Sequence, residues 1–161
     1  MSQSNAHDIK ILKGLSHHLS DNAETYREAA TEVEHAGYRD WFTARAQERD
    51  AMAQDLKTEI TQRGGTADDE GSILAKAQRA FLDIKQALLR SDTSLVDSIE
   101  TSETDLVNRF ASAIEDEGLS ATTRESLRRA HGRILATREQ VAELKHSLDS
   151  QATVDNPLYP R

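Results

Sequence analysis

The sequence predicts an all-α fold, built as a bundle of four long helices. The chain has 161 residues, of which 37% are hydrophobic, 30% charged and 4% aromatic, and it contains two prolines. Few aromatic residues and few prolines disfavour a β-sandwich, whereas abundant Ala, Leu, Glu, Gln, Arg and Lys favour long helices. Apolar residues also recur every three or four positions, which is the spacing of amphipathic helices. This length is enough for one domain with a substantial core.

The first helix is expected from Ala6 to His35, after a disordered N-terminus over residues 1–5. Asn5 is suited to cap its start, and Gly37 is suited to end it in a left-handed conformation. The residues that share its apolar face are Ile9, Leu12, Leu15, Leu19, Ala23, Tyr26, Ala30 and Val33.

The second helix is expected from Tyr38 to Arg63 and should end at the glycine pair that follows. Its core-facing row is Tyr38, Phe42, Ala46, Arg49, Met52, Leu56 and Ile60. Tyr38, Trp41 and Phe42 gather aromatic side chains at the turn between the first two helices. We expect them to close one end of the bundle. The alternative is that Trp41 is exposed and anchors a dimer.

A polar stretch, GGTADDEG, separates the first two helices from a shorter helix that Ser72 can cap. The apolar row of this connecting helix is Leu74, Ala77, Phe81, Ile84 and Leu88. Its spacing alternates between three and four residues, so a helix is predicted here as well.

The last two long helices are expected at residues 93–117 and 122–149. Gly118 should end the first of them, and Thr122 opens the second in a sequence of capping-box form, TTRE. The tail QATVDNPLYPR has no periodicity and contains both prolines, so residues 151–161 should be extended or disordered. The folded domain is therefore expected to span residues 6–150.

The expected connections pair the long helices as two hairpins joined by a long linker. Short loops make neighbouring helices antiparallel, and one long crossover is the connectivity of ferritin-like bundles. The sequence thus predicts a ferritin-like four-helix bundle with an additional short connecting helix between the two hairpins.

Composition excludes several classes of function. A formal charge of −8 argues against a nucleic-acid or anionic-membrane partner, because both require a cationic face. The absence of cysteine excludes disulfides, thiolate metal sites and cysteine catalysis. The sequence shows no secretory signal and no apolar stretch of the ~18 residues that a membrane span needs, so a cytoplasmic protein is expected. It contains no phosphate-binding loop and no nucleophile elbow, and we assign no catalytic residue.

Polar residues interrupt the apolar faces of three helices. Arg49 lies at the centre of the second helix's row. Glu103 lies in the row Leu95, Ile99, Glu103, Leu106 and Phe110, and His131 in the row Leu127, His131, Ile134 and Val141. Such groups are costly inside a helical core unless each has a partner. We therefore expect a buried hydrogen-bond network of Arg49, Glu103 and His131 that fixes the register of the helices.

The competing prediction is a metal centre. Carboxylate-bridged di-metal bundles take one Glu from each of two helices and a Glu-x-x-His pair from each of the other two. Here Ala51 replaces the His that should follow Glu48, and Arg128 replaces the Glu that should precede His131. At most Glu48, Glu103 and His131 remain, and the inward arginine of the second helix would repel a cation, so no di-iron centre is expected. A single divalent ion (Fe, Mn or Zn) at these three residues is the alternative to our preferred expectation of no cofactor.

The order and spacing of several segments resemble a bacterial family of ferritin-like four-helix bundles known only as a domain of unknown function. These segments are LSDNAETYREAA, WFTARAQERDAMAQDLKTEI with GG after it, DDEGSILAKAQRAFLDIKQALL, SIETSETDLVNRF and RRAHGRI. The resemblance runs from Ile9 to Ser147 and implies a soluble bacterial bundle with no established reaction. We expect a non-catalytic protein that acts through self-association, as a homo-oligomer such as a dimer, or through a protein partner. A link to stress comes from the resemblance alone.

Overall fold

The computed structural model describes residues 3–67 and 91–154, with side chains described up to residue 150. The helices are α1 (Gln3–Glu32), α2 (Ala36–Gln62), α4 (Asp92–Ile114) and α5 (Ala121–Val154). The described residues contain no strand, which confirms the all-α prediction. None of the helices in these two ranges is both long enough and apolar enough to pass through a membrane. The predicted connecting helix and its cap at Ser72 lie outside the described residues.

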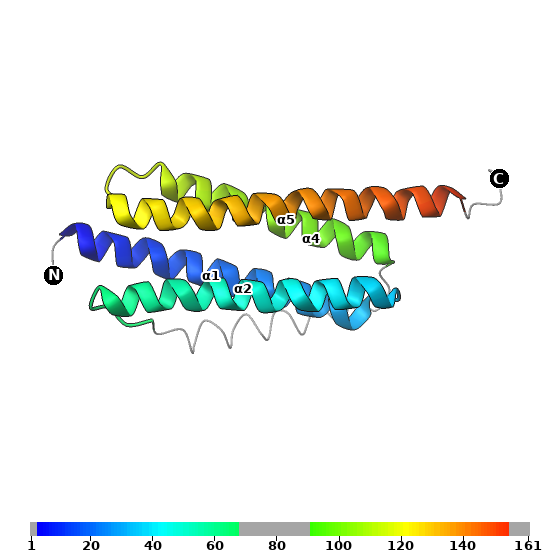
Figure 1. Cartoon of the computed structure of the whole chain (residues 1–161), viewed down its shortest axis with the longest axis horizontal. Helices are drawn as coiled ribbons and strands as arrows, with labels where there is room; N and C mark the ends of the chain where they lie inside the picture. Colours follow the sequence, from blue (N-terminus) through cyan, green and yellow to red (C-terminus); the bar gives the residue numbers. More distant parts are fainter. Residues whose placement is uncertain (1–2, 68–90, 155–161) are drawn as a thin grey trace.

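The helices form two antiparallel hairpins, α1 with α2 and α4 with α5, which pack into one bundle (Figure 1). At one end, the start of α1 meets the end of α2, where Asn5 Nδ2 donates a hydrogen bond to the Arg63 carbonyl at 2.7 Å. At the other end, the Glu34 N–H donates to Asp92 Oδ1 at the start of α4, at 3.0 Å. The end of α2 and the start of α4 therefore lie at opposite ends of the bundle.

The core runs along the bundle as two apolar clusters, and each draws on all the described helices. The cluster nearer the start of α1 includes Leu12, Leu19, Leu56, Ile60, Leu106, Phe110, Leu127 and Ile134. The cluster nearer the α1–α2 turn includes Tyr26, Val33, Phe42, Val96, Ile99 and Val141. The apolar rows predicted for these described helices thus face the core. Two charged side chains, Arg49 and Glu103, are fully buried together with them.

The turn between α1 and α2 differs from the prediction. Gly37 was expected to end the first helix, but it lies in the first turn of α2 and has no positive φ. His35 is the N-cap of α2, and its Nδ1 atom accepts a hydrogen bond from the Gly37 N–H at 3.1 Å. Because an imidazole supplies the acceptor that the first N–H groups of α2 need, no left-handed residue is required here.

The start of α1 also differs, whereas the end of α2 agrees. Helix α1 begins at Gln3, so Asn5 lies inside the helix rather than at its N-cap. Gly64 has a φ of 85°, and the Gly65 N–H bonds to the Ile60 carbonyl at 2.9 Å. This is the left-handed helix ending that the glycine pair predicts.

Helix α5 starts and ends close to its expected limits. Ser120, rather than Thr122, precedes its first residue, Ala121, and provides the capping hydroxyl. The helix continues to Val154, five residues past the predicted end at Asp149.

Candidate functional site

Glu103 places a carboxylate in the middle of the core. It lies one turn after Ile99 on the buried face of α4, and its side chain is 0% exposed. Arg49, on the buried face of α2, is also 0% exposed, and its Nη2 atom donates to Glu103 Oε2 at 3.0 Å. Both charged groups point inward because each belongs to an apolar helical row. They neutralise each other, and a buried charge without such a partner would be strongly destabilising.

The other carboxylate oxygen of Glu103 is bonded from α1. The Tyr26 hydroxyl donates to Oε1 at 2.8 Å, and Asn22 Nδ2 donates to the same atom at 3.0 Å. Asn22 Nδ2 also donates to Ser102 Oγ at 2.9 Å. Burial raises the pKa of Tyr26, and the negative charge of Glu103 raises it further, so the phenol remains a donor. Three helices therefore meet at one carboxylate.

His131 is half-buried on α5, and the structure shows no hydrogen bond from its ring to Arg49 or Glu103. Its Nε2 atom is buried and has no hydrogen-bond partner among residues 3–67 and 91–150. Arg49 Nε, Arg49 Nη1 and Asn22 Oδ1 are likewise buried and unpartnered in these ranges. Of the predicted trio, the structure joins Arg49 to Glu103 directly and leaves the histidine outside the hydrogen-bonded group.

Glu48 lies on α2, but its carboxylate is paired away from the core. Arg45 Nε lies 3.4 Å from one oxygen, and Arg133 Nη2 of α5 lies 3.6 Å from the other. In the part of the chain that is described, no three or more His, Asp or Glu side chains form a group that could hold a metal ion. The structure thus does not gather Glu48, Glu103 and His131 into one ligand set. A cation at either carboxylate would have to compete with the arginines already there.

Sequence reasoning missed two of the residues around Glu103. Tyr26 was assigned only to an apolar row, and Asn22 received no role. The signal was present, because Leu15, Leu19, Asn22 and Tyr26 follow one another at spacings of three and four on the buried face of α1. Polar groups at such positions are expected to meet another buried polar group.

A second buried carboxylate, Asp8, closes the end of the bundle where α1 begins. It is 1% exposed. Its Oδ1 atom accepts the Ser120 N–H at 3.0 Å, and its Oδ2 atom accepts the hydroxyls of Ser120 and Thr123. Burial alone would raise the pKa of Asp8, but these hydrogen bonds, with the nearby charge of Arg63, lower it overall. A side chain of α1 thus caps α5, which sequence reasoning also missed.

Comparison with known proteins places these residues in a family. Residues 7–116 match the model of a family described as Domain of unknown function (DUF2383). Neither the curated proteins nor the solved structures include a match to this chain. The matched range contains most of α1 and all of α2 and α4, with both members of the buried ion pair, and it stops before α5. Because the match covers more than half of the chain, the protein belongs to the family Domain of unknown function (DUF2383).

Proposed function

We propose that this protein is a non-catalytic helical bundle that acts by self-association, as a dimer, or by binding a protein partner. The observation that carries the proposal is the burial and hydrogen bonding of the Glu103 carboxylate. Its side chain is 0% exposed and its oxygens accept hydrogen bonds from Arg49, Tyr26 and Asn22, whereas a general base must lie within reach of its substrate. This buried carboxylate therefore serves to hold three helices together.

The end of the bundle that carries the α1–α2 turn is the surface we propose for association. Trp41 is half-buried there, with its ring centroid 6.1 Å from that of Tyr26 and the Arg45 guanidinium 5.3 Å from its ring. Figure 1 shows the C-terminal end of α5 extending past the other helices at this same end. Tryptophan and arginine are the side chains that most often dominate interface energy. A second copy packed there would cover Trp41 and lie against the extended end of α5.

The wider assignment draws on topology and resemblance. The end of α2 and the start of α4 lie at opposite ends of the bundle. This arrangement supports the proposal of a ferritin-like bundle, in which one long connection joins the two hairpins. We further propose that the protein is bacterial and cytoplasmic and has a role in stress, on the basis of the resemblance and the sequence. We also propose that it binds no nucleic acid, because its formal charge is −8.

The competing proposal is a metal-binding bundle with a reduced site at Glu48, Glu103 and His131, taking Fe, Mn or Zn. One observation favours it, namely the buried Nε2 atom of His131, which has no hydrogen-bond partner within the described chain. A neutral imidazole nitrogen is the commonest metal ligand in proteins. Arg49 opposes the proposal, because it neutralises Glu103 at 3.0 Å.

Light scattering over a concentration series tests self-association. We expect a dimer whose dissociation constant rises at least about tenfold in Trp41→Ala, the loss typical of an interface hot spot. Leu135→Ala is the matched control, since Leu135 is the large hydrophobic residue that the described surface exposes, at 37%, and it lies on α5 away from this end. A protein that is monomeric at every concentration, or a dimer that Leu135→Ala weakens as much as Trp41→Ala, would overturn the proposed surface.

Metal content after purification without chelator or affinity tag tests the competing proposal. The preferred function predicts substoichiometric metal in the wild type and in His131→Ala. Stoichiometric metal that disappears in His131→Ala and Glu103→Gln, but persists in the control His146→Ala, would establish the metal-binding function instead. His146 is an exposed histidine of the same helix, so it tests for adventitious binding to imidazole.

A further inference from the structure

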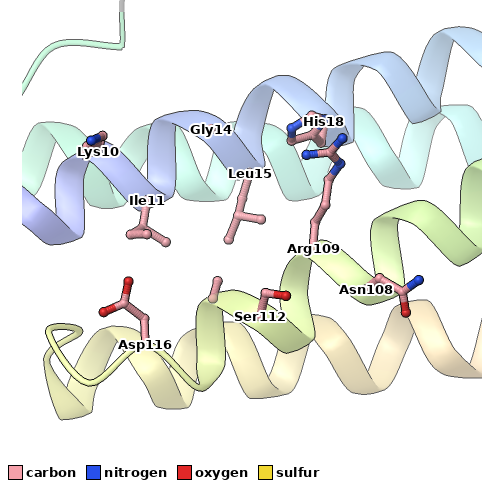
Figure 2. A pocket seen from close by; sticks show the side chains of 10 residues that line it. Lys10, Ile11, Gly14, Leu15, His18, Asn108, Arg109, Ser112 and Asp116 are labelled. Carbon is pink, nitrogen blue, oxygen red and sulfur yellow. The ribbon is translucent and has the colours of Figure 1, made fainter.

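A groove of about 490 Å³ lies on the surface between α1 and α4 (Figure 2). Ile11 and Leu15 point into it from α1, and Ala113 of α4 contributes to its lining. Its volume falls in the range of small-molecule pockets, roughly 300–1,000 Å³. From Lys10 to His18, the limits of the lining on α1, the helix rises about 12 Å. The groove therefore has the apolar floor and the length to hold a medium-length alkyl chain.

The rim of the groove carries basic groups, although the chain as a whole has a charge of −8. Lys10, His18 and Arg109 line it, and Figure 2 shows the Arg109 side chain reaching from α4 toward His18 of α1. Arg109 also pairs with Asp105 of the same helix, to which its Nε atom donates at 2.8 Å. Lys10 and Arg109 place two positively charged side chains beside the apolar floor, and such groups favour an anionic ligand.

The acidic residue that lines the groove, Asp116, is already engaged. Its Oδ1 atom accepts the Gly118 N–H at 2.8 Å, and its Oδ2 atom lies 2.9 Å from His7 Nε2. These two hydrogen bonds lower the pKa of Asp116, the first more than the second. The carboxylate is thus held at the α4–α5 turn, at the end of the groove opposite Arg109 in Figure 2.

Gly14 keeps the floor of the groove open. It lies in the interior of α1, where glycine is less favourable than alanine. It has no positive φ, and an added Cβ would have no atom within 4 Å. Neither backbone conformation nor packing in the described structure therefore requires glycine, and any longer side chain here would occupy the groove. Gly132 of α5 shares both properties but lies outside the groove, so it provides a matched reference.

We propose that this groove binds a small anionic amphiphile, such as a medium-chain carboxylate. The alkyl tail lies over Gly14 between Ile11 and Leu15, and the anionic head lies toward Arg109 and His18. This binding site goes beyond the proposed role in self-association, because the groove between α1 and α4 does not include the end of the bundle that carries Trp41.

Titration of the ¹⁵N-labelled protein with sodium decanoate, below its micelle concentration, tests the proposal. We expect saturable amide shifts confined to residues 10–18 and 108–116. Decyltrimethylammonium, which has the same tail and the opposite charge, should cause no such shifts. Absence of saturable binding, equal binding of the cation, or shifts centred elsewhere would each overturn the proposal. So would selective binding of an acidic amphipathic peptide with no response to decanoate, because the ligand would then be a macromolecule.

Paired variants then separate the groove from the rest of the surface. Gly14→Leu fills the floor and should weaken decanoate binding at least about tenfold, whereas Gly132→Leu should leave it unchanged. Arg109→Gln should weaken binding at least about threefold, and Arg138→Gln, at an exposed position on α5, should not. Equal effects within either pair would refute the assigned site. Circular dichroism verifies that each variant is folded, and light scattering on the same samples reports self-association separately.

Discussion

Glu103→Leu should be among the most destabilising single substitutions in this protein. Leucine suits the apolar row of α4, but it leaves Arg49, which is 0% exposed, as an uncompensated charge. Removing one partner of a buried pair costs about 3–5 kcal/mol. The Tyr26 hydroxyl loses its acceptor as well, at a further cost of about 1–3 kcal/mol. The expected total, about 4–8 kcal/mol, is comparable to the whole stability of a typical domain. At about 2–4 °C per kcal/mol for a chain of this length, the Tm should fall by roughly 8–30 °C.

The double variant Arg49→Met/Glu103→Leu should recover most of this loss. A buried ion pair replaced by apolar residues of similar volume is often neutral or even stabilising. Arg49→Met alone should cost about 3–5 kcal/mol, because it leaves the carboxylate unpaired. The coupling energy between the two positions, the cost of the double variant minus the summed costs of the single variants, should therefore exceed about 3 kcal/mol in magnitude, the upper end of the usual range for contacting residues. Adding Tyr26→Phe removes the hydroxyl that would otherwise lack an acceptor.

Urea unfolding followed by circular dichroism measures these differences, and an unchanged m-value shows that the native and unfolded states retain their compactness. Arg45→Met is the matched control, because Arg45 is the same residue type one turn earlier on α2, half-buried and 3.4 Å from Glu48. Its loss should cost less than about 1 kcal/mol. If either core single variant cost as little as this control, or if the double variant cost the sum of the two, the argument for a desolvated, coupled pair would be wrong.

Three further predictions concern other positions. Asp8→Asn should lower the free energy of unfolding by about 1–2 kcal/mol at neutral pH, as loss of a helix cap does. The folded-state pKa of Asp8 lies below its ordinary value of 3.8. Its contribution to the free energy of unfolding is therefore present above pH 3.8 and is lost as the pH falls through the folded-state pKa. In urea titrations at acid pH, the free energies of unfolding of the wild type and the variant should become equal. Tyr26→Phe should cost about 1.5–3 kcal/mol, the value of a hydrogen bond to a charged group. The pKa of Tyr26 is raised above its ordinary value of 10.0. The contribution of its hydroxyl to the free energy of unfolding is therefore lost as the pH rises past 10.0. Tyrosinate absorbance from Tyr26 should appear only when the protein unfolds. Gly132→Ala should raise the free energy of unfolding by about 0.5–1 kcal/mol, since no atom lies within 4 Å of the added methyl, and a lower melting temperature than that of the wild type would contradict this.

Helical periodicity was sufficient to direct Arg49 and Glu103 into the core. A period of 3.6 residues fixes the face on which a side chain lies, so two inward charges on different helices could be expected to meet. Periodicity does not fix which residues of neighbouring helices lie at the same level. That depends on the turns, and the α1–α2 turn was mispredicted at Gly37. The contacts of Tyr26 and Asn22 with Glu103 could therefore not be assigned from the sequence.

Capping signals were correct at the end of α2 and wrong at the starts of α1 and α5. Gly64 ends α2 through its own left-handed backbone, which the sequence shows directly. Asn5 has good N-cap chemistry, but it lies inside α1 and donates instead to the Arg63 carbonyl. The carboxylate that caps α5 comes from Asp8, 112 residues before Ser120. No rule based on neighbouring residues can detect such a partner.

This long-range cap imposes an order on folding during synthesis. The carboxylate of Asp8 cannot form these hydrogen bonds until Ser120 has been made, 112 residues later. The first turn of α5 thus depends on a group in the first turns of α1. Fusion tags or deletions that disturb the beginning of α1 should consequently loosen the last helix, although the two segments lie far apart along the gene.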